Sequence, residues 1–391
     1  MLDDVGAGVP AAAGFVPVEP ERLFDTRPVG GDRVLVVSKR KYGGDGDVLR
    51  IKVTGAAGVP ESGVTAVSLN VTVTDPESDG FLTVYPCGVR PDSSTLNYVA
   101  GQTVPNAVIA PVSAGGEVCF YSQAHTHLLA DVNGWFPADA GFTALAPRRL
   151  ADTREDEPNG AIAVRKGRRG GTGNVLQLDV TGAAGLPAGG VGAVSLNVAV
   201  TEPVGSGFAT VYPCGIRPDA SNLNYTAAQT VANEVIAPVS ADGKVCVFSQ
   251  VDAHLIVDVN GWFATGPMYV SEPPQRLFDT RVDQPDGAVK VDKQRVGGAT
   301  MLRLKVTGAA GLPATNIAAV SLNVTAVGAS RAGYVTVFPC GDRPNASSLN
   351  YAQGQTVANA VVAPVSSGGE VCLYSQYGVD LVADVNGWFG S

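Results

Sequence analysis

The segment AVSLNVTVT, residues 66–74, alternates apolar and polar side chains from Val67 to its end. Its valines and its leucine occupy every second position from Val67 to Val73, with serine, asparagine and threonine between them. A period of two is typical of a β-strand with one buried face. The same pattern returns at Val194 and Val320, so the rest of the chain has to be compared with itself.

The chain repeats three times around this strand. RLFDTR begins at Arg22 and returns in similar form at Arg149 and Arg276, and the period is 126 to 127 residues. DVNGWF closes each copy, starting at Asp131, Asp258 and Asp384. Such a period is far longer than a solenoid unit, so each copy is the size of a domain. We predict an N-terminal tail over 1–20 and three domains, joined by short spacers, over 21–137, 148–264 and 275–391.

Other segments of each copy also have strand character. In the first copy these include LRIKV (49–53), which alternates, and FLTVYPC (81–87) and EVCFYSQ (117–123), which are apolar enough to be buried on both sides. Turn residues separate the segments, and no helical periodicity lasts longer than a turn or two. Eight or nine short strands in each copy predict an all-β protein of three tandem antiparallel β-sandwich domains, jelly-roll-like.

All six cysteines fall on the same two positions of the repeat. The pairs are Cys87 with Cys119, Cys214 with Cys246, and Cys340 with Cys372, each 32 residues apart. Six cysteines allow fifteen pairings, and the repeat favours one disulfide within each copy. A loop of this size would stabilise the fold by about 3 to 4 kcal/mol. Disulfides persist outside the reducing cytosol, so we expect an extracellular or cell-surface protein. Metal binding is the alternative, but two thiols without a recurring histidine make an incomplete site.

Composition excludes two classes of partner. The net charge is −9 and no long basic run is present, so we expect no nucleic-acid partner. No apolar run approaches the roughly 18 residues of a transmembrane helix, so we expect no membrane span. The first twenty residues lack the features of a secretory signal, which implies that a signal was removed or that export is not directed from this chain.

The residues that usually perform catalysis do not recur. The histidines are His125, His127 and His254, and the third copy has none. No nucleophile, metalloprotease or phosphate-loop motif is present, so we predict no enzymatic activity, no cofactor and no metal.

Two carboxylates do recur in each copy. They are Asp25, Asp152 and Asp279, and Asp131, Asp258 and Asp384. Asp25 stands between Arg22 and Arg27, which favours a structural ion pair or turn cap. A calcium site and a glycosidase acid pair are the alternatives.

Three kinds of recurring residue are candidates for ligand binding. The tryptophans could stack on a sugar ring, although a core role is the stronger interpretation. The Asn–Tyr pairs suit glycan contacts but equally suit a strand end that satisfies loop backbone. The residues are Trp135, Trp262 and Trp388, with Asn97, Tyr98, Asn224, Tyr225, Asn350 and Tyr351.

A basic cluster also recurs ahead of the second strand of each copy. Three such loops could contact anionic wall polymers multivalently, or could be ordinary solvated loops. The residues are Lys39, Arg40, Lys41, Arg165, Lys166, Arg168, Arg169, Lys290, Lys293 and Arg295.

The combination of RLFDTR, VTGAAGVP, VYPCG and DVNGWF resembles a repeat module of secreted actinobacterial proteins, over nearly the whole chain from Glu21 to Phe389. The module occurs there in tandem or appended to exported hydrolases, and the resemblance implies a non-catalytic, envelope-associated accessory role. This chain has no catalytic domain beside it.

We therefore expect a secreted or surface-displayed protein whose three modules bind envelope glycans or partner proteins. The alternative is a structural spacer, or a self-assembling subunit of an extracellular structure. The sequence leaves open the ligand, the oligomeric state, and whether the copies form a line or close around a pseudo-threefold axis.

Overall fold

The computed structural model describes residues 14–29, 33–298 and 300–391, and within these ranges it contains 24 β-strands and no helix. The strands form six four-stranded antiparallel sheets, two from each copy of the repeat. The all-β class is therefore confirmed. Residues 1–13 of the expected N-terminal tail lie outside the described residues.

The first copy shows how each pair of sheets is built. One sheet has the order β1-β8-β3-β6, and the other has the order β2-β7-β4-β5. Strands therefore alternate between the two sheets along most of the chain, as in a jelly roll. The strands are β1 (Val16–Asp25), β2 (Leu49–Lys52), β3 (Val64–Thr74), β4 (Gly80–Pro86), β5 (Leu96–Tyr98), β6 (Val104–Pro111), β7 (Glu117–Ser122) and β8 (His127–Pro137).

The second and third copies repeat this order strand for strand. The second copy contains β9 (Phe142–Asp152), β10 (Leu176–Asp179), β11 (Val191–Thr201), β12 (Gly207–Pro213), β13 (Leu223–Tyr225), β14 (Val231–Pro238), β15 (Lys244–Ser249) and β16 (His254–Ala264). The third contains β17 (Tyr269–Asp279), β18 (Met301–Lys305), β19 (Ile317–Val327), β20 (Gly333–Pro339), β21 (Leu349–Tyr351), β22 (Val357–Pro364), β23 (Glu370–Ser375) and β24 (Asp380–Gly390).

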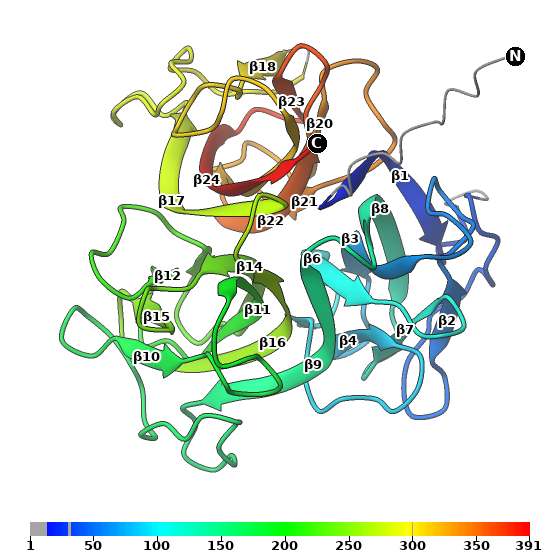
Figure 1. Ribbon diagram of the computed structural model, residues 1–391. Coiled ribbons are helices and arrows are strands. Elements are labelled where there is room, and N and C mark those ends of the chain that lie inside the picture. Colours follow the sequence, from blue (N-terminus) through cyan, green and yellow to red (C-terminus); the bar gives the residue numbers. More distant parts are fainter. Residues whose placement is uncertain (1–13, 30–32, 299) are drawn as a thin grey trace, which may run out of the picture.

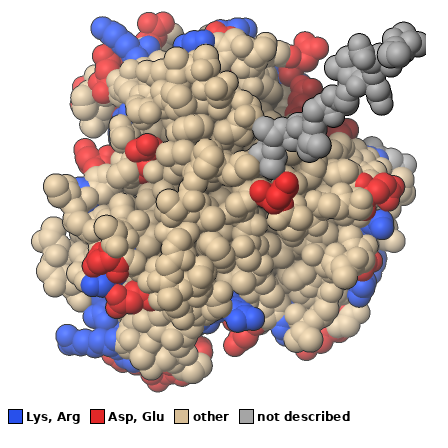
Figure 2. Space-filling view, in the orientation of Figure 1, with Lys and Arg blue, Asp and Glu red and all other residues tan. Residues whose placement is uncertain are grey.

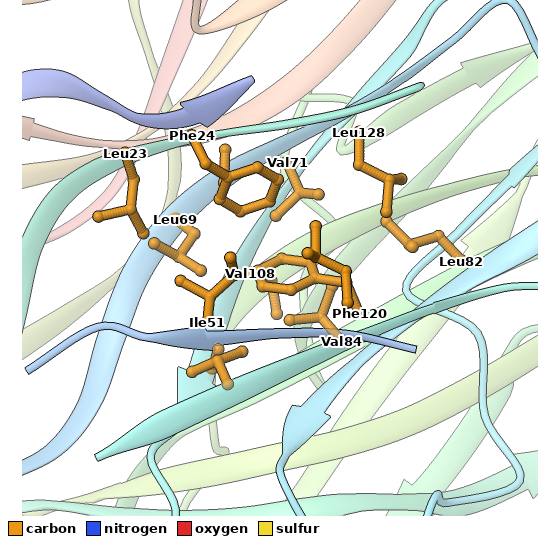
Figure 3. Packing of buried hydrophobic residues seen from close by; sticks show 14 of the residues in the cluster. Leu23, Phe24, Ile51, Leu69, Val71, Leu82, Val84, Val108, Phe120 and Leu128 are labelled. Atoms are coloured by element: carbon orange, nitrogen blue, oxygen red, sulfur yellow. The ribbon is translucent and has the colours of Figure 1, made fainter. Parts of the chain in front are cut away.

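Each copy has its own core between its two sheets, and Figure 3 shows that of the first copy. Phe24 from β1 and Phe120 from β7 meet across the gap with ring centroids 5.1 Å apart. The disulfide lies outside this core. Cys119 packs with Tyr85 and Tyr121 in a separate cluster, and it is bonded to Cys87. The equivalent disulfides Cys214–Cys246 and Cys340–Cys372 are also formed, so the predicted pairing within each copy is confirmed.

A fourth core joins the three copies at the centre of the molecule, where the three lobes of Figure 1 meet. Six aromatic rings form a closed circuit there, each 4.6 to 5.0 Å from the next. In order they are Phe15, Phe136, Phe142, Phe263, Tyr269 and Phe389.

The shared core corrects the expectation of three separate sandwich domains. The six sheets are grouped propeller-like around one centre, because each copy contributes two aromatic side chains that pack on each other and on those of the neighbouring copies. The first strand of each copy begins at Val16, Phe142 or Tyr269, ahead of the expected domain starts. Most of each expected spacer is therefore strand, and only residues 138–141 and 265–268 connect consecutive copies.

Candidate functional site

The recurring carboxylates lie in ion-paired clusters. Arg27 donates from Nη2 to Oδ2 of Asp25 at 2.7 Å, and its backbone N–H donates to Oδ1 at 3.0 Å. Burial by itself would raise the pKa of Asp25, but the hydrogen bonds from Arg27 hold that pKa below its usual value. Asp152 and Asp279 have the same arrangement and the same direction of shift.

The second carboxylate of each copy is deeper. Asp131 is 1% exposed and accepts hydrogen bonds from Arg22, which also pairs with Asp25. Burial raises the pKa of Asp131 and Asp384, and raises that of Asp258 to about 6, against the opposing effect of the paired arginines. These contacts match the structural ion pair expected for the recurring aspartates.

The clusters lie at the junctions between copies. The backbone N–H of Ser347, in the third copy, donates to Oδ2 of Asp131 at 3.3 Å. Buried asparagines complete each junction. The amide of a sixth-strand asparagine donates to the Oδ1 of a third-strand asparagine at 2.9 to 3.1 Å: Asn106 to Asn197, Asn233 to Asn323, and Asn359 to Asn70. The last of these pairs joins the third copy to the first, so the ring is closed.

The predicted tyrosines are committed to the fold. Tyr98, Tyr225 and Tyr351 are 3 to 4% exposed, and each hydroxyl hydrogen-bonds a buried serine hydroxyl at 2.6 to 2.7 Å. The neighbouring Asn97, Asn224 and Asn350 are half-buried. Sequence polarity alone could not distinguish these roles, because the serine partner lies 24 residues further along the chain.

The tryptophans that the sequence analysis identified are partly buried. Trp135, Trp262 and Trp388 are half-buried, and each packs against the core of its own copy. This placement agrees with the core role and leaves part of each ring accessible.

Most of the predicted basic side chains have partners within the chain. Lys39, Lys166 and Lys293 each donate to the backbone oxygen of the paired aspartate at 2.8 Å. Arg40, Lys41, Lys290, Arg168 and Arg295 form ion pairs with Asp47, Asp75, Asp286, Glu202 and Asp380. Arg169 is buried and donates to the backbone oxygen of Arg165. On the face shown in Figure 2, basic and acidic groups are interspersed towards the edge and form no single patch.

The junction between the third and first copies is hollowed into a groove, and a separate hollow of about 700 Å³ lies between the first copy and the start of β9. A cavity of about 600 Å³ opens between the third and first copies, and its lining includes Arg22, Arg27, Arg33, Arg343, Asn350 and Tyr351. No aspartate or glutamate belongs to this lining as far as the structure describes it. An adjoining hollow shares Arg22, Arg33, Pro344 and Asn345 with this cavity and carries Glu19 and Glu21. We refer to the first cavity as the 3/1 groove.

The 3/1 groove unites residues that sequence reasoning did not connect. Of the predicted residues it contains Asn350 and Tyr351, whereas Arg33 and Arg343 were not singled out. Alignment of the three copies would have marked Arg33, because glycines 160 and 287 stand at its position. Arg343 lies close to the first copy only because the three copies close into a ring, so its place in the groove could not be predicted from the sequence.

Among the described residues, no three histidine, cysteine, aspartate or glutamate side chains gather as a metal site would require. The described chain also has no helix long and apolar enough to cross a bilayer.

Comparison with known proteins gives no family. No protein-family model and no curated protein matches the chain. Among solved structures, the chain is similar to one reported as the triple jelly roll fold and turret assembly in an archaeal virus. The identity is 10% and the TM-score is 0.23, over 96% of this chain and 91% of that one. A likeness of this size carries no argument about function.

Proposed function

We propose that this protein is a non-catalytic protein of the extracellular space or cell surface, in which three sandwich-like modules form one body that binds envelope glycans. The observation that carries the proposal is the 3/1 groove. Its volume of about 600 Å³ is within the range of small-ligand sites, and its lining combines guanidinium groups with amide and hydroxyl groups. Such donors suit the hydroxyls and acidic groups of sugars.

The extracellular location is supported by the three disulfides, because such bonds persist in oxidising compartments. The non-catalytic assignment is supported by the recurring carboxylates, since they are paired with arginines of the same copy, and Asp131 also accepts a hydrogen bond from the third copy.

Retention on purified actinobacterial cell wall tests this function. We expect the intact protein to be retained at low salt and released as salt is raised, because charged contacts are screened. A protein that passes through the wall fraction at low salt would contradict the proposal.

A structural role is the second candidate, and the closed ring favours it. Residues 138–141 and 265–268 are too short to let the copies move independently, which suits a rigid subunit of an extracellular assembly. Light scattering should then show particles larger than one chain as the concentration rises. A monomer at all concentrations argues for the glycan-binding role.

A further inference from the structure

The three junctions are built from equivalent residues, so a difference between them indicates a difference in what they bind. The loop after the fourth strand carries Arg90 and Asp92 in the first copy and Arg217 and Asp219 in the second. In the third copy the same positions are Arg343 and Asn345. The lining of the 3/1 groove therefore lacks the loop carboxylate that both other junctions have at this position, while Asp342 stands outside the lining where the other loops have Val89 and Ile216.

The loop carboxylates act on the neighbouring copy. Burial raises the pKa of Asp258 to about 6, and the negative charge of Asp92 adds to this effect across the first junction. Asp219 acts in the same way on Asp384 at the second junction. In the 3/1 groove the neutral Asn345 lines the cavity at that place.

Arg33 is the second difference. Glycine stands at its position in the other copies, where a Cβ at Gly160 would lie 2.5 Å from the backbone carbonyl of Leu150. Arg33 belongs to the lining of the groove, and its Nε atom is buried without a hydrogen-bond partner. A buried N–H without an acceptor is costly, and Arg217 Nη1 is unpaired in the same way in the second copy, so the feature particular to this junction is the guanidinium of Arg33 in the groove lining.

The two differences leave the lining of the groove with four arginines, at positions 22, 27, 33 and 343, and no carboxylate among its described residues. Beside it, Arg22 pairs with Asp25 and Asp131, and Arg27 pairs with Asp25. Glu19 and Glu21 line the adjoining hollow, and the other copies have Ala146 and Arg148, or Pro273 and Gln275, at their positions. An anion is therefore favoured by the groove lining itself, and not by the net charge of the junction.

We propose that the 3/1 groove binds an anionic carbohydrate, with its carboxylate or phosphate held by Arg33 and Arg343 and its hydroxyls by the neighbouring amides. Guanidinium groups bind both kinds of anion through paired N–H donors. Asn345, Asn350 and Gln355 line the same cavity and supply the amides. Glu19 and Glu21 line the adjoining hollow together with Arg33 and Asn345, so the acidic group belongs on the Arg343 side of Arg33, away from these carboxylates. This inference rests on the proposed glycan-binding function and names the ligand class.

The test is calorimetric titration of the full chain with trigalacturonate, poly(glycerol phosphate) and the neutral maltotriose. We expect at least one anionic probe to bind at low salt, and maltotriose to bind about tenfold more weakly or not at all. The tighter of the two anionic probes identifies the acidic group as carboxylate or phosphate.

Two variants give the groove the residues of the other junctions. N345D and R33G should each weaken binding of the anionic probe by about tenfold or more. R50Q, which removes an exposed arginine paired with Glu117 far from the groove, should leave the affinity unchanged. N345D keeps the size of the side chain, and its thermal unfolding should match that of the parent protein.

Equal binding of maltotriose, or affinity unaffected by both groove variants, would overturn the inference. Retention on cell wall without binding of either anionic probe would also overturn it while leaving the proposed function standing. Failure of the parent protein to be retained on cell wall is the separate result that rejects the proposed glycan-binding function.

Discussion

Arg22 forms ion pairs with two carboxylates, and one of them is almost fully buried. Its guanidinium pairs with Asp131, which is 1% exposed, and with Asp25. Removal of one partner leaves a charge in a place where water cannot solvate it, and the penalty for a buried pair is several kcal/mol. The contribution of this arginine to stability therefore exceeds that of an arginine in an exposed pair.

We expect R22M to lower the free energy of unfolding by about 3 kcal/mol. R50M is the matched control, because its partner Glu117 is accessible and an exposed pair contributes less than about 1 kcal/mol. Urea denaturation of both variants measures the difference. If R22M and R50M lowered the free energy of unfolding by similar amounts, the buried ion pairs of Arg22 would stabilise the protein no more than an exposed ion pair does.

Glu234 breaks the symmetry of the centre. Alanine occupies its position in the other copies, at Ala107 and Ala360, and all three residues line a small cavity shared by the copies. Burial raises the pKa of Glu234 to about 8, although Ser195 and Asn260 donate hydrogen bonds to its carboxyl group. The folded protein therefore keeps this proton over a range where the unfolded chain has lost it.

Stability should fall as pH rises from the unfolded pKa of Glu234, near 4.5, to about 8. The slope for one such group is at most about 1.4 kcal/mol per pH unit. E234Q carries no titrating group, so we expect its unfolding free energy to decline less than that of the parent protein between pH 6 and 8. Parallel profiles in denaturant titrations would show that Glu234 is ionised in the folded state.

For single residues, the sequence predicted which groups are bonded to each other better than it predicted which groups are buried. The positions of Asp25 and of the cysteines follow from the repeat itself. The location of the Tyr98 hydroxyl depends on Ser122, and the burial of Glu234 depends on two other copies, so neither can be derived from local pattern.

Among the elements, β8, β16 and β24 connect the core of each copy to the shared centre. Each contains the DVNGWF segment, in which the glycine lies directly beneath an aromatic ring at the start of the first strand or just before it. A Cβ at Gly261 would lie 2.4 Å from Cζ of Phe142 and 2.7 Å from the backbone oxygen of Thr143. Glycine is therefore required at this position, because the first strand lies too close for a side chain.

G261A should destabilise the protein by about 2 to 3 kcal/mol, because the added methyl group must displace β9 or Phe142. At Gly189 the same added atom meets nothing within 4 Å, so G189A should change stability by less than about 0.5 kcal/mol. Thermal unfolding of the pair measures this. The prediction fails if G261A unfolds at the temperature of G189A.

Alternation of side chains predicted the third strand of each copy, and apolar runs predicted the strands that carry or precede the cysteines. The start of β9 was assigned to a spacer, since FTALAP (142–147) contains no alternation and ends in proline. Its strand conformation comes from pairing with β16, and the register shifts between Val259 and Gly261. Irregular pairing of this kind leaves no periodic pattern in the sequence.

Over the whole molecule, the three copies contact one another head to tail, and such contacts close into a ring only when the rotation between neighbours allows it. The three copies of this chain meet this condition, because the hydrogen bond between Asn359 and Asn70 joins the third copy to the first. Sequence analysis left a line and a ring equally open. The decisive aromatic residues, Phe15, Phe142 and Tyr269, precede the recognised motifs, and each packs on one ring of its own copy and one ring of a neighbouring copy.

Phe263 tests whether the centre couples the copies. Its ring lies 4.6 Å from those of Phe142 and Tyr269 and about 6 Å from those of Phe136 and Phe389. F263A should lower stability by about 3 to 5 kcal/mol. Because the cavity opens towards all three copies, amide hydrogen exchange should accelerate in β3 and β19 as well as in β11.

L178A is the comparison, since Leu178 belongs only to the core of the second copy. We expect its faster exchange to be largest within β10, β12 and β15, with smaller changes in the other copies. If exchange in F263A also accelerated only in the second copy, the three modules would be independently stable, and the shared core would add contact without cooperativity. Coupled exchange would instead explain how linkers of four residues suffice, because the aromatic circuit, and not the connecting chain, holds the copies in place.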